Sequence, residues 1–326
     1  MRVLVTGATG KVGNAVARRL VERGDDVVAL VRDADRARSR LPAGVELVRG
    51  DVTDVPSVHR AVAGVDGVFN CMGLFEQWLS DPGEFDRVNA VGAATVVAAA
   101  RQAGARRVVH TSTYDVFHAE PGGTVREDIV ADYPKGTPYE RSKQRAEELV
   151  LAEAGHGIQV VIVNPGGIYG QGPWAEAGFD AMFRDVILGR LRVVEPGGAA
   201  LVLAEDVAAA HLAAFDRGRA GGRYIAANRF ATVREMCEAA VTAAGRGRVP
   251  RTIPAGVARA LAGGGELLAR LTRHPPLVAS GDLQWLLWQA RADSSKAERE
   301  LGVTFTPWPE GVRRTVHWML EESGQL

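Results

Sequence analysis

The stretch Val3-Leu4-Val5-Thr6-Gly7-Ala8-Thr9-Gly10-Lys11-Val12-Gly13 decides the fold of this 326-residue chain. Its three leading apolar residues predict a buried strand, and the glycines that follow predict a tight turn into a helix. A strand that turns through glycines into a helix exposes backbone N–H groups at the helix N-terminus, which is a ready site for a pyrophosphate. The stretch therefore predicts that the chain binds a dinucleotide.

The glycine spacing is G-x-x-G-x-x-G, whereas the commoner dinucleotide fingerprint is G-x-G-x-x-G, and glycines also serve ordinary turns. The surrounding sequence favours the functional interpretation. After the glycines, apolar residues recur at helical spacing up to Gly24, and a second apolar run follows over 27–31. Together these segments form a β-α-β unit of about thirty residues, the length that a parallel crossover needs.

The first half of the chain continues this alternation. Further strands are expected at 45–48, 67–71, 107–111 and 159–163, and helices at 56–63, 84–103 and 139–154. Strict alternation of strand and helix predicts an α/β fold built on a Rossmann-type, doubly wound parallel sheet.

After Pro165 the alternation stops, and Gly, Pro and Trp become frequent. We expect a dinucleotide-binding Rossmann domain over 1–165 and a smaller C-terminal substrate-binding lobe over 166–326. Strand candidates at 201–203 and 223–226 predict that segments near 199–228 return to the Rossmann sheet.

The leucine-rich segment over 255–271 has two interpretations. It could be a membrane-surface helix, because apolar residues recur along it. The glycines at 263–265 interrupt it, however, so packing against the substrate lobe is the favoured interpretation.

The composition argues against several other classes of protein. Lys plus Arg and Asp plus Glu number 39 each, so the formal net charge is zero and nothing steers a nucleic acid or an anionic membrane toward the chain as a whole. Cys71 and Cys237 are too few for a disulfide framework, and the seven histidines are scattered, so we expect no metal site and a reducing, cytoplasmic compartment. The chain begins directly with the first strand, which predicts no targeting signal and no membrane partner.

The catalytic signal lies in Tyr139-Glu140-Arg141-Ser142-Lys143. A spacing of four places the phenol and the ammonium on one helix face. An ammonium beside a phenol favours the phenolate, which predicts a tyrosine pKa below its reference of about 10 and a usable proton donor and acceptor. Such pairs also occur by chance. Thr111-Ser112-Thr113, at the end of the preceding strand, supports the catalytic interpretation because strand carboxyl ends face the cofactor crevice.

The chain resembles the extended short-chain dehydrogenase/reductases, within the NAD(P)-dependent epimerase/dehydratase group. The motifs that carry the resemblance are Gly7, Gly10 and Gly13; Asp51-Val52; Asn89; Thr111-Ser112-Thr113; Tyr139 with Lys143; Asn164-Pro165-Gly166 with Tyr169-Gly170; and Glu205-Asp206-Val207-Ala208. Near the C-terminus, 275–278 and 293–302 are similar to the branch that contains dihydroflavonol-4-reductase-like proteins and hopanoid-associated sugar epimerases. These motifs are specific for the family and much less specific for a substrate.

The resemblance implies three catalytic residues. Tyr139 would be the general acid in carbonyl reduction and the base in the reverse direction, and Lys143 would hold the nicotinamide ribose and depress the pKa of Tyr139. Thr113 would hydrogen-bond the substrate oxygen, in a place where serine is frequent in the family. Ser112 is the less favoured candidate because neighbouring residues of a strand point to opposite faces.

The resemblance also implies the cofactor contacts. Asp51 would meet the adenine edge and Val52 its flank. The other implied contacts are Thr6, Gly7, Thr9, Gly10, Lys11, Val12, Gly13, Cys71, Met72, Asn89, Thr111, Tyr139, Lys143, Pro165, Gly166 and Ile168. Cys71 and Met72 depart from the small residues that the family more often has there, and for Asn70 a turn-stabilising role and a ligand contact both remain open.

The charge at the end of the second strand favours NADP(H). NAD-using relatives have an acidic residue there, whereas this chain has Val31 followed by Arg32, whose guanidinium can pair a 2′-phosphate. Asp33 argues in the opposite direction, and Arg32 could be a solvated loop charge, so NAD(H) remains possible.

The aromatic residues point to the substrate. Expected substrate contacts are Phe75, Trp78, Thr113, Tyr169 and Trp174, although most large aromatics belong to a core. With little basic clustering beyond Arg184, Arg190 and Arg192, these walls favour reduction of a small, apolar or aromatic ketone or aldehyde, or oxidation of the corresponding alcohol. A nucleotide-sugar epimerase or dehydratase with tightly bound cofactor and a non-catalytic NADP(H) sensor stay open. Either a monomer or a homodimer is expected.

Overall fold

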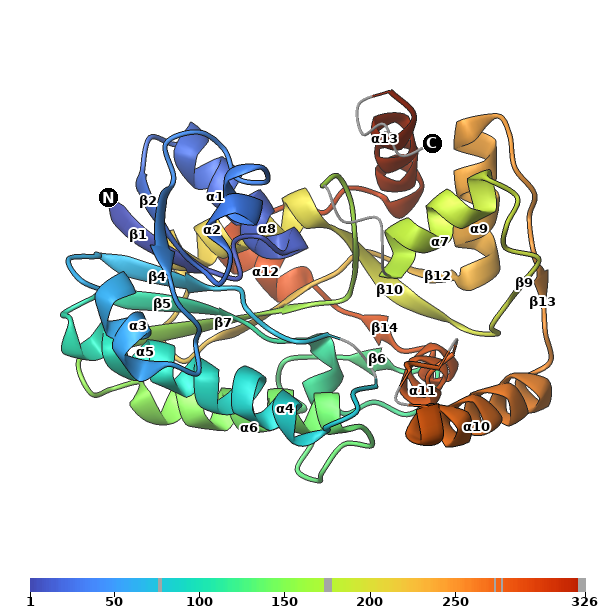
Figure 1. Ribbon diagram of the computed structural model, residues 1–326, viewed down its shortest axis with the longest axis horizontal. Coiled ribbons are helices and arrows are strands. Elements are labelled where there is room, and N and C mark those ends of the chain that lie inside the picture. Colours follow the sequence, from blue (N-terminus) through green and yellow to red (C-terminus); the bar gives the residue numbers. More distant parts are fainter. Residues whose placement is uncertain (76–77, 173–177, 273, 277, 322–326) are drawn as a thin grey trace.

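A seven-stranded parallel sheet forms the centre of the protein (Figure 1). The structure, a computed structural model, describes residues 1–75, 78–172, 178–272, 274–276 and 278–321. The strands of this sheet, in the order β3-β2-β1-β4-β5-β7-β11, are β3 (Glu46–Arg49), β2 (Asp26–Val31), β1 (Arg2–Thr6), β4 (Gly67–Asn70), β5 (Arg107–Thr111), β7 (Gln159–Pro165) and β11 (Arg223–Ala226). The chain direction across the sheet reverses between β1 and β4, where doubly wound folds bind ligands. The predicted α/β fold with a Rossmann-type sheet is confirmed.

Helices cover both faces of this sheet. One face carries α1 (Lys11–Glu22), α8 (Ala204–Arg217) and α12 (Ser295–Leu301), and the other carries α3 (Val55–Ala61), α5 (Ala93–Gln102) and α6 (Pro138–Glu153). A short α2 (Ala34–Arg38) follows β2. In β1, Val3 and Val5 belong to the first core and Leu4 to the second, and the strand is buried from Val3 to Thr6. Burial on two faces explains the unbroken apolar runs of the sequence.

The helix expected over 84–103 has three parts. A single turn, α4 (Gly83–Phe85), leads into the π-helix η1 (Asp86–Gly92), and α5 completes the segment. A π-helical stretch widens the turn and often occurs at a functional position. Here it contains Asn89, one of the predicted cofactor contacts.

The second half of the chain adds a lobe over the carboxyl ends of the strands (Figure 1). Within the described residues, it contains three small sheets. The first has three strands, β8 (Gly167–Tyr169), β10 (Gly198–Leu203) and β12 (Phe230–Thr232), with β10 in the middle. The other two each have two strands: β9 (Val193–Val194) with β13 (Arg251–Thr252), and β14 (Arg291–Ala292) with β6 (Thr124–Val125). The lobe helices are α7 (Gly178–Ile187), α9 (Val233–Ala244), α10 (Ala255–Thr272), α11 (Ser280–Trp288) and α13 (Trp308–Glu321).

The two halves are more interleaved than a division at residue 165 allows. β11 joins the central sheet beside β7, as expected, but the strand predicted at 201–203 belongs to β10, which pairs with β8 and β12 in the lobe. In addition, α8 packs on α1, and Val303 and Phe305 enter the same core as β1. These later segments complete the cover of the sheet face on which α1 lies.

The packing of α10 also differs in part from the expectation. The helix runs unbroken through Gly263, Gly264 and Gly265, and its buried residues are the alanines Ala258, Ala262 and Ala269. Its leucines, Leu261, Leu267, Leu268 and Leu271, are 58 to 79 % exposed. The segment packs against the lobe, as predicted, because Ala258 and Ala262 contact Leu283 of α11. Its leucines remain exposed, so the contact is made by the small residues.

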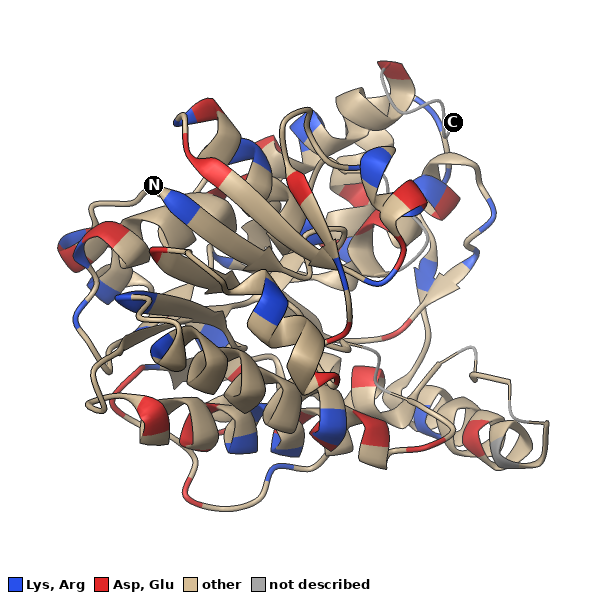
Figure 2. Cartoon of the chain, turned by 60° about the vertical axis from the view of Figure 1, so that its left-hand side comes forward, with Lys and Arg blue, Asp and Glu red and all other residues tan. Residues whose placement is uncertain are grey.

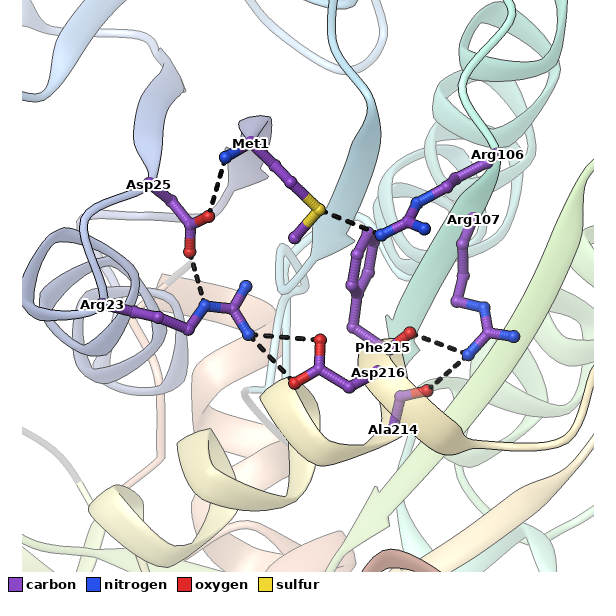
Figure 3. Close-up of polar contacts among 8 residues, drawn as sticks. All are labelled: Met1, Arg23, Asp25, Arg106, Arg107, Ala214, Phe215 and Asp216. Atoms are coloured by element: carbon purple, nitrogen blue, oxygen red, sulfur yellow. Dashed lines mark hydrogen bonds and ion pairs between the residues drawn. The ribbon is translucent and has the colours of Figure 1, made fainter.

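At the amino ends of the strands, arginine side chains join the sheet and α1 to the end of α8 (Figure 3). The Arg107 guanidinium donates to the carbonyls of Ala214 and Phe215 at the end of α8, at 3.2 and 2.7 Å, and Arg23 bridges Asp25 and Asp216. Cations stabilise helix C-termini and satisfy their free carbonyls. Pairs between residues far apart in the sequence hold this end of the sheet, and the candidate site lies at the opposite end.

Candidate active site

The turn between β1 and α1 requires two of its glycines. Gly7 has a φ of +63°, and a Cβ there would lie 2.7 Å from the backbone of Cys71 and Met72. A Cβ on Gly13 would lie 2.3 Å from the Gly7 carbonyl oxygen. Gly10 is the N-cap of α1, and its N–H donates to Gly7 at 2.8 Å. The turn that carries Thr9 and Val12 thus lies directly against the end of β4, and only glycine at these two positions allows so close an approach.

Lys11 links this turn to the lobe. Its ammonium donates to the Gly170 carbonyl at 2.8 Å and forms an ion pair with the buried carboxylate of Asp180 in α7. Burial raises the pKa of Asp180, and Lys11 opposes this. Lys11 was predicted to contact the cofactor, but in this structure its ammonium is engaged in the ion pair that joins α1 to α7.

A buried polar chain crosses the strand ends. The Thr6 hydroxyl donates to Asn70 Oδ1 at 2.6 Å, and Asn70 Nδ2 donates to His110 Nδ1 at 3.1 Å. Burial lowers the pKa of His110 well below its ordinary value, so the ring is neutral and its proton lies on Nε2. His110 Nε2 has no hydrogen-bond partner among the described residues. Asn70 was expected either to stabilise a turn or to contact the ligand. In the structure its side chain instead links β1, β4 and β5.

Lys143 is held at the end of β5. Its Nζ donates to the Thr111 carbonyl at 3.0 Å, and the side chain is only 5 % exposed. The Thr111 hydroxyl contacts His211 Nε2 at 2.7 Å; because His211 Nδ1 donates to the Val207 carbonyl, Nε2 is the acceptor. Burial lowers the pKa of Lys143 to about 8, against the opposing charge of Glu147. Cys71 is a thiol beside this lysine, since burial raises its pKa to about 12.

The start of α6 fixes the position of Tyr139. The Thr137 hydroxyl accepts from the Glu140 N–H at 3.1 Å, the Glu140 carboxylate accepts from the Thr137 N–H at 2.8 Å, and Pro138 occupies the first turn. This reciprocal cap sets the residue at which the helix begins. Tyr139 is half-buried, with its ring edge toward Phe85 at a centroid distance of 6.3 Å.

Asn89 ties the π-helix to α6 and to the loop after β4. Its Oδ1 accepts from the Leu74 N–H at 2.7 Å, and its Nδ2 donates to the Leu74 carbonyl and to Ser142 Oγ, both at 3.0 Å. Its amide is therefore engaged within the protein. Asn89 holds in place the loop that follows Cys71 and Met72.

The hydroxyl of Thr113 has a partner that sequence reasoning missed. Thr113 Oγ1 donates to Asp115 Oδ2 at 2.8 Å, and Trp285 Nε1 donates to Asp115 Oδ1 at 2.7 Å. Burial, and secondarily the charge of Glu140, raises the pKa of Asp115 to about 6. The only sequence signal was an acidic residue two positions after Thr113, and nothing in the sequence indicated Trp285.

Glu147 is a second residue that was missed. Asn164 Nδ2 donates to Glu147 Oε1 at 2.7 Å and to the Thr113 carbonyl at 3.0 Å, and Glu147 Oε2 accepts from Arg223 at 2.6 Å. Glu147 lies one turn after Lys143 on the same face of α6, a spacing that could have indicated it. After Asn164 come Pro165, Gly166 and Ile168. A Cβ on Gly166 would lie 2.5 Å from the Ala200 carbonyl oxygen.

The outer cofactor positions lie after β2 and β3. Arg32 is exposed, and no hydrogen bond or ion pair to it occurs within the described part of the chain. Asp33 caps α2, accepting from the N–H groups of Asp35 and Arg36 at 3.0 Å each. Asp51 accepts from the N–H and hydroxyl of Thr53 at 2.9 and 2.7 Å, and Val52 is buried.

Two cavities lie on either side of Gln284. The larger, of about 790 Å³, is lined by Trp78, Leu79, Phe85, Thr137, Pro138 and Glu266, among others. The smaller, of about 680 Å³, is lined by Lys135, Arg259, Ala262, Trp285 and Trp288, among others. Both also contact Gly136 and Ser280. The larger cavity adjoins Tyr139 through Pro138 and Phe85, so it is the better candidate for a substrate pocket.

The aromatic residues predicted to contact the substrate lie in different places relative to these cavities. Trp78 lines the larger cavity, whereas Phe75 is 60 % exposed and lines neither. Tyr169 departs from the expectation: it is fully buried in the lobe core beside Phe183, and its hydroxyl donates to the Trp308 carbonyl at 3.3 Å. Trp174 lies outside the described residues.

Comparison with known proteins places the chain in a family. Residues 3–228 match the NAD dependent epimerase/dehydratase family. The chain is 32 % identical to sterol demethylase protein B of Methylococcus capsulatus over 98 % of this chain and 99 % of the relative, and 33 % identical to 2-alkyl-3-oxoalkanoate reductase of Stenotrophomonas maltophilia over 85 and 87 %. The solved UDP-glucose 4-epimerase of Thermus thermophilus, in complex with NAD, superposes with a TM-score of 0.80 at 26 % identity, covering 99 and 100 %.

The chain therefore belongs to the NAD-dependent epimerase/dehydratase family, and the predicted resemblance is confirmed. Within it, the protein is an NAD(P)-dependent reductase or dehydrogenase of the extended short-chain group. Among the helices that the structure describes, none combines the length and apolar character needed to cross a bilayer. The described side chains also contain no group of three or more His, Cys, Asp or Glu able to hold a metal ion.

Proposed function

We propose that the protein uses NADP(H) to reduce the ketone or aldehyde of a small, apolar or aromatic substrate, or to oxidise the corresponding alcohol. The observation that carries this proposal is the position of Tyr139, which lies one turn from the buried Lys143 and beside the cavity lined by Trp78, Leu79 and Phe85. A neutral apolar substrate loses little hydration in such a cavity, whereas a charged one would leave its charges poorly paired. The name of one relative mentions a sterol, which agrees with an apolar substrate, and the name of another, an oxoalkanoate reductase, agrees with reduction of a ketone.

The preference for NADP(H) is supported by the different roles of Arg32 and Asp33. Asp33 uses a carboxylate oxygen to cap α2, so its acidic side chain serves the helix. The exposed Arg32 beside it is available for the 2′-phosphate that distinguishes NADP(H) from NAD(H).

The residues at the strand ends fit a nicotinamide dinucleotide. A Cβ on Gly7 or Gly13 would collide with neighbouring backbone, so the turn that would hold the pyrophosphate depends on these glycines. The Lys143 ammonium, held at the end of β5, would bind the nicotinamide ribose. When bound, the dinucleotide supplies or accepts the hydride. Tyr139 Oη is the group that gives a proton to the carbonyl oxygen in reduction and takes it back in oxidation.

The hydrogen bonds that the Thr113 hydroxyl can offer a substrate depend on whether the Asp115 carboxyl group is ionised or protonated. When Asp115 is ionised, its carboxylate accepts a hydrogen bond from the Thr113 hydroxyl, and Thr113 Oγ1 accepts one from the Asp115 N–H, so one lone pair of Oγ1 remains for the O–H of an alcohol. When Asp115 is protonated, it can donate to Thr113 Oγ1, and the threonine hydroxyl is then free to donate to a carbonyl oxygen. Trp285 holds the carboxyl group in place in both states.

A nucleotide-sugar epimerase is the rival within the same family, since the fold superposes on a UDP-glucose 4-epimerase. The arginines that the sequence offered for a sugar-nucleotide pyrophosphate do not favour it. Arg184 and Arg190 both lie near the Asp185 carboxylate, at 3.2 and 3.9 Å, and Arg192 is an exposed residue before β9.

A panel of aryl and alicyclic ketones with NADPH, followed by cofactor oxidation, tests the proposal. Turnover is expected with several ketones and is expected to be lost in Tyr139→Phe. Epimerisation of a UDP- or GDP-sugar, with cofactor retained through purification, would contradict the proposal in favour of the epimerase. Cofactor binding without turnover of any substrate class would favour a sensor.

A further inference from the structure

The face of α10 that points away from α11 is apolar. Its exposed residues are Val257, Leu261, Leu267, Leu268 and Leu271, at 48 to 79 % exposure. Spacings of four and seven residues place Val257, Leu261 and Leu268 on one helix face. The helix is attached through its other side, where Ala258 and Ala262 pack on Leu283 of α11. The leucines are not needed for that attachment, and neighbouring exposed apolar residues of this size mark a contact surface.

The same part of the chain has an excess of positive charge. Residues 246–274 contain six arginines and one acidic residue, Glu266, although the formal net charge of the whole chain is zero. Arg246, Arg248 and Arg251 are exposed on the segment that runs through β13 into α10 at one edge of the molecule (Figure 1). The Glu266 carboxylate is engaged with α11, accepting from the Ser280 N–H at 2.7 Å.

The part of the molecule that contains the central sheet differs from this segment. There, Figure 2 shows Lys and Arg interspersed with Asp and Glu. A local excess of arginine next to exposed leucines therefore distinguishes α10 and the segment before it.

We propose that α10 and residues 246–254 dock on the surface of a bilayer that contains anionic lipids. The leucines enter the boundary between headgroups and acyl chains, and the arginines pair with the lipid phosphates. A helix with one apolar side and flanking arginines suits this interface. A second copy of the chain is a poorer occupant, because a two-fold contact would bring two positively charged segments together.

Docking would place both cavities beside the lipid. Arg259 and Ala262 of α10 line the smaller cavity, and Glu266 lines the larger. An apolar carbonyl compound partitions into lipid, so it would reach the cavities from the membrane surface. This consequence rests on the proposed function, whereas the docking itself does not.

Co-sedimentation of the full chain with phosphatidylcholine vesicles, with and without roughly a third of phosphatidylglycerol, tests the proposal. We expect the anionic vesicles to bind at least about tenfold more tightly, with the affinity falling as salt screens the arginines. The double variant Leu267→Ser with Leu271→Ser, and the double variant Arg248→Gln with Arg251→Gln, should each weaken binding about tenfold. The matched controls on α3, Val55→Ser and Arg60→Gln, should leave binding unchanged.

Three results would overturn the proposal. They are absence of binding to anionic vesicles at low salt, undiminished binding by the leucine variant, and a dimer in sedimentation velocity that the leucine variant dissolves while vesicles stay unbound. Circular dichroism is the check that the variants fold. Turnover of a water-soluble ketone without vesicles should be the same in the leucine variant as in the unmodified chain, so failure to dock is distinguishable from failure of the proposed function.

Discussion

Helices α6 and α10 reverse the usual distribution of side chains between core and surface. α6 buries the charged residues Glu140, Lys143 and Glu147, whereas α10 exposes four leucines to solvent. Buried charges cost free energy unless they are paired, and exposed apolar residues gain none from burial within the fold. Glu140 caps α6 and Glu147 pairs with Arg223, so both serve the fold. The buried Lys143 ammonium and the exposed leucines of α10 are the two features that we assign to a reaction and to a docking surface.

The largest expected effect tests the buried polar side of α6. Tyr139→Phe removes the proton donor and little contact area, so kcat should fall by about 10²- to 10⁴-fold while the NADPH dissociation constant changes little. Steady-state kinetics and calorimetric titration measure the two quantities. Tyr224→Phe, which removes a hydroxyl bonded to Glu300 at the far edge of the sheet, is the control. Substantial turnover by Tyr139→Phe would show that α6 buries Lys143 for another reason.

Arg32→Ala tests whether the cofactor side of the sheet selects NADP(H). A hydrogen bond to a charged group is worth roughly 1.5 to 3 kcal/mol, so the preference for NADPH over NADH should fall about ten- to a hundredfold. Titration calorimetry with both cofactors gives the ratio. Arg38→Ala, at an exposed arginine paired with Asp35, should leave the ratio unchanged. Equal affinities in the unmodified protein would refute the preference.

Asp115 predicts a pH dependence of about tenfold. With a pKa of about 6, the carboxyl group passes from mostly protonated at about pH 5 to mostly ionised at about pH 7, and the fraction of Thr113 able to donate to a carbonyl falls about tenfold. Asp115→Asn keeps a donor to Thr113 at every pH, so this part of the dependence should disappear from the ratio of reduction to oxidation rates. An identical pH profile in both proteins would exclude the two-state role of Thr113.

The same carboxyl group contributes to stability with a definite sign. Its pKa in the folded protein lies above the unfolded value of about 3.8, so its contribution is fully present below that value and is lost as the pH rises through about 6. Thermal unfolding between pH 4 and 8 should therefore show a smaller decline in Asp115→Asn than in the unmodified protein. An equal decline in both would contradict the raised pKa.

The smallest effect is expected on the apolar side of α10. Leu271→Ala should change the free energy of unfolding by less than about 0.5 kcal/mol, because Leu271 is 79 % exposed. Leu201→Ala, in the fully buried lobe core, should cost about 2 to 5 kcal/mol. Urea unfolding measures both. A cost above about 1 kcal/mol for Leu271→Ala would mean that the leucines stabilise the fold, and the contrast between the two helices would fail.

The fold and the shared helix face of Tyr139 and Lys143 could be predicted because each depends on short-range patterns. Alternating apolar runs specify a doubly wound sheet, a spacing of three specifies the glycine turn, and a spacing of four places Tyr139 and Lys143 on one face. The prediction for Tyr169 did not match the structure because a motif position does not reveal burial. Its ring became part of the lobe core when α13 packed against it.

The sequence by itself determined the parallel sheet, the glycine turn and the shared face of Tyr139 and Lys143, because those features need only neighbours within a few residues. Only the tertiary structure decided that Trp285 holds Asp115, that His211 accepts from Thr111, and that Glu147 meets Arg223. It also decided which side of α10 is exposed. Burial and long-range pairing depend on segments that meet only in the folded chain, so no local pattern could contain them.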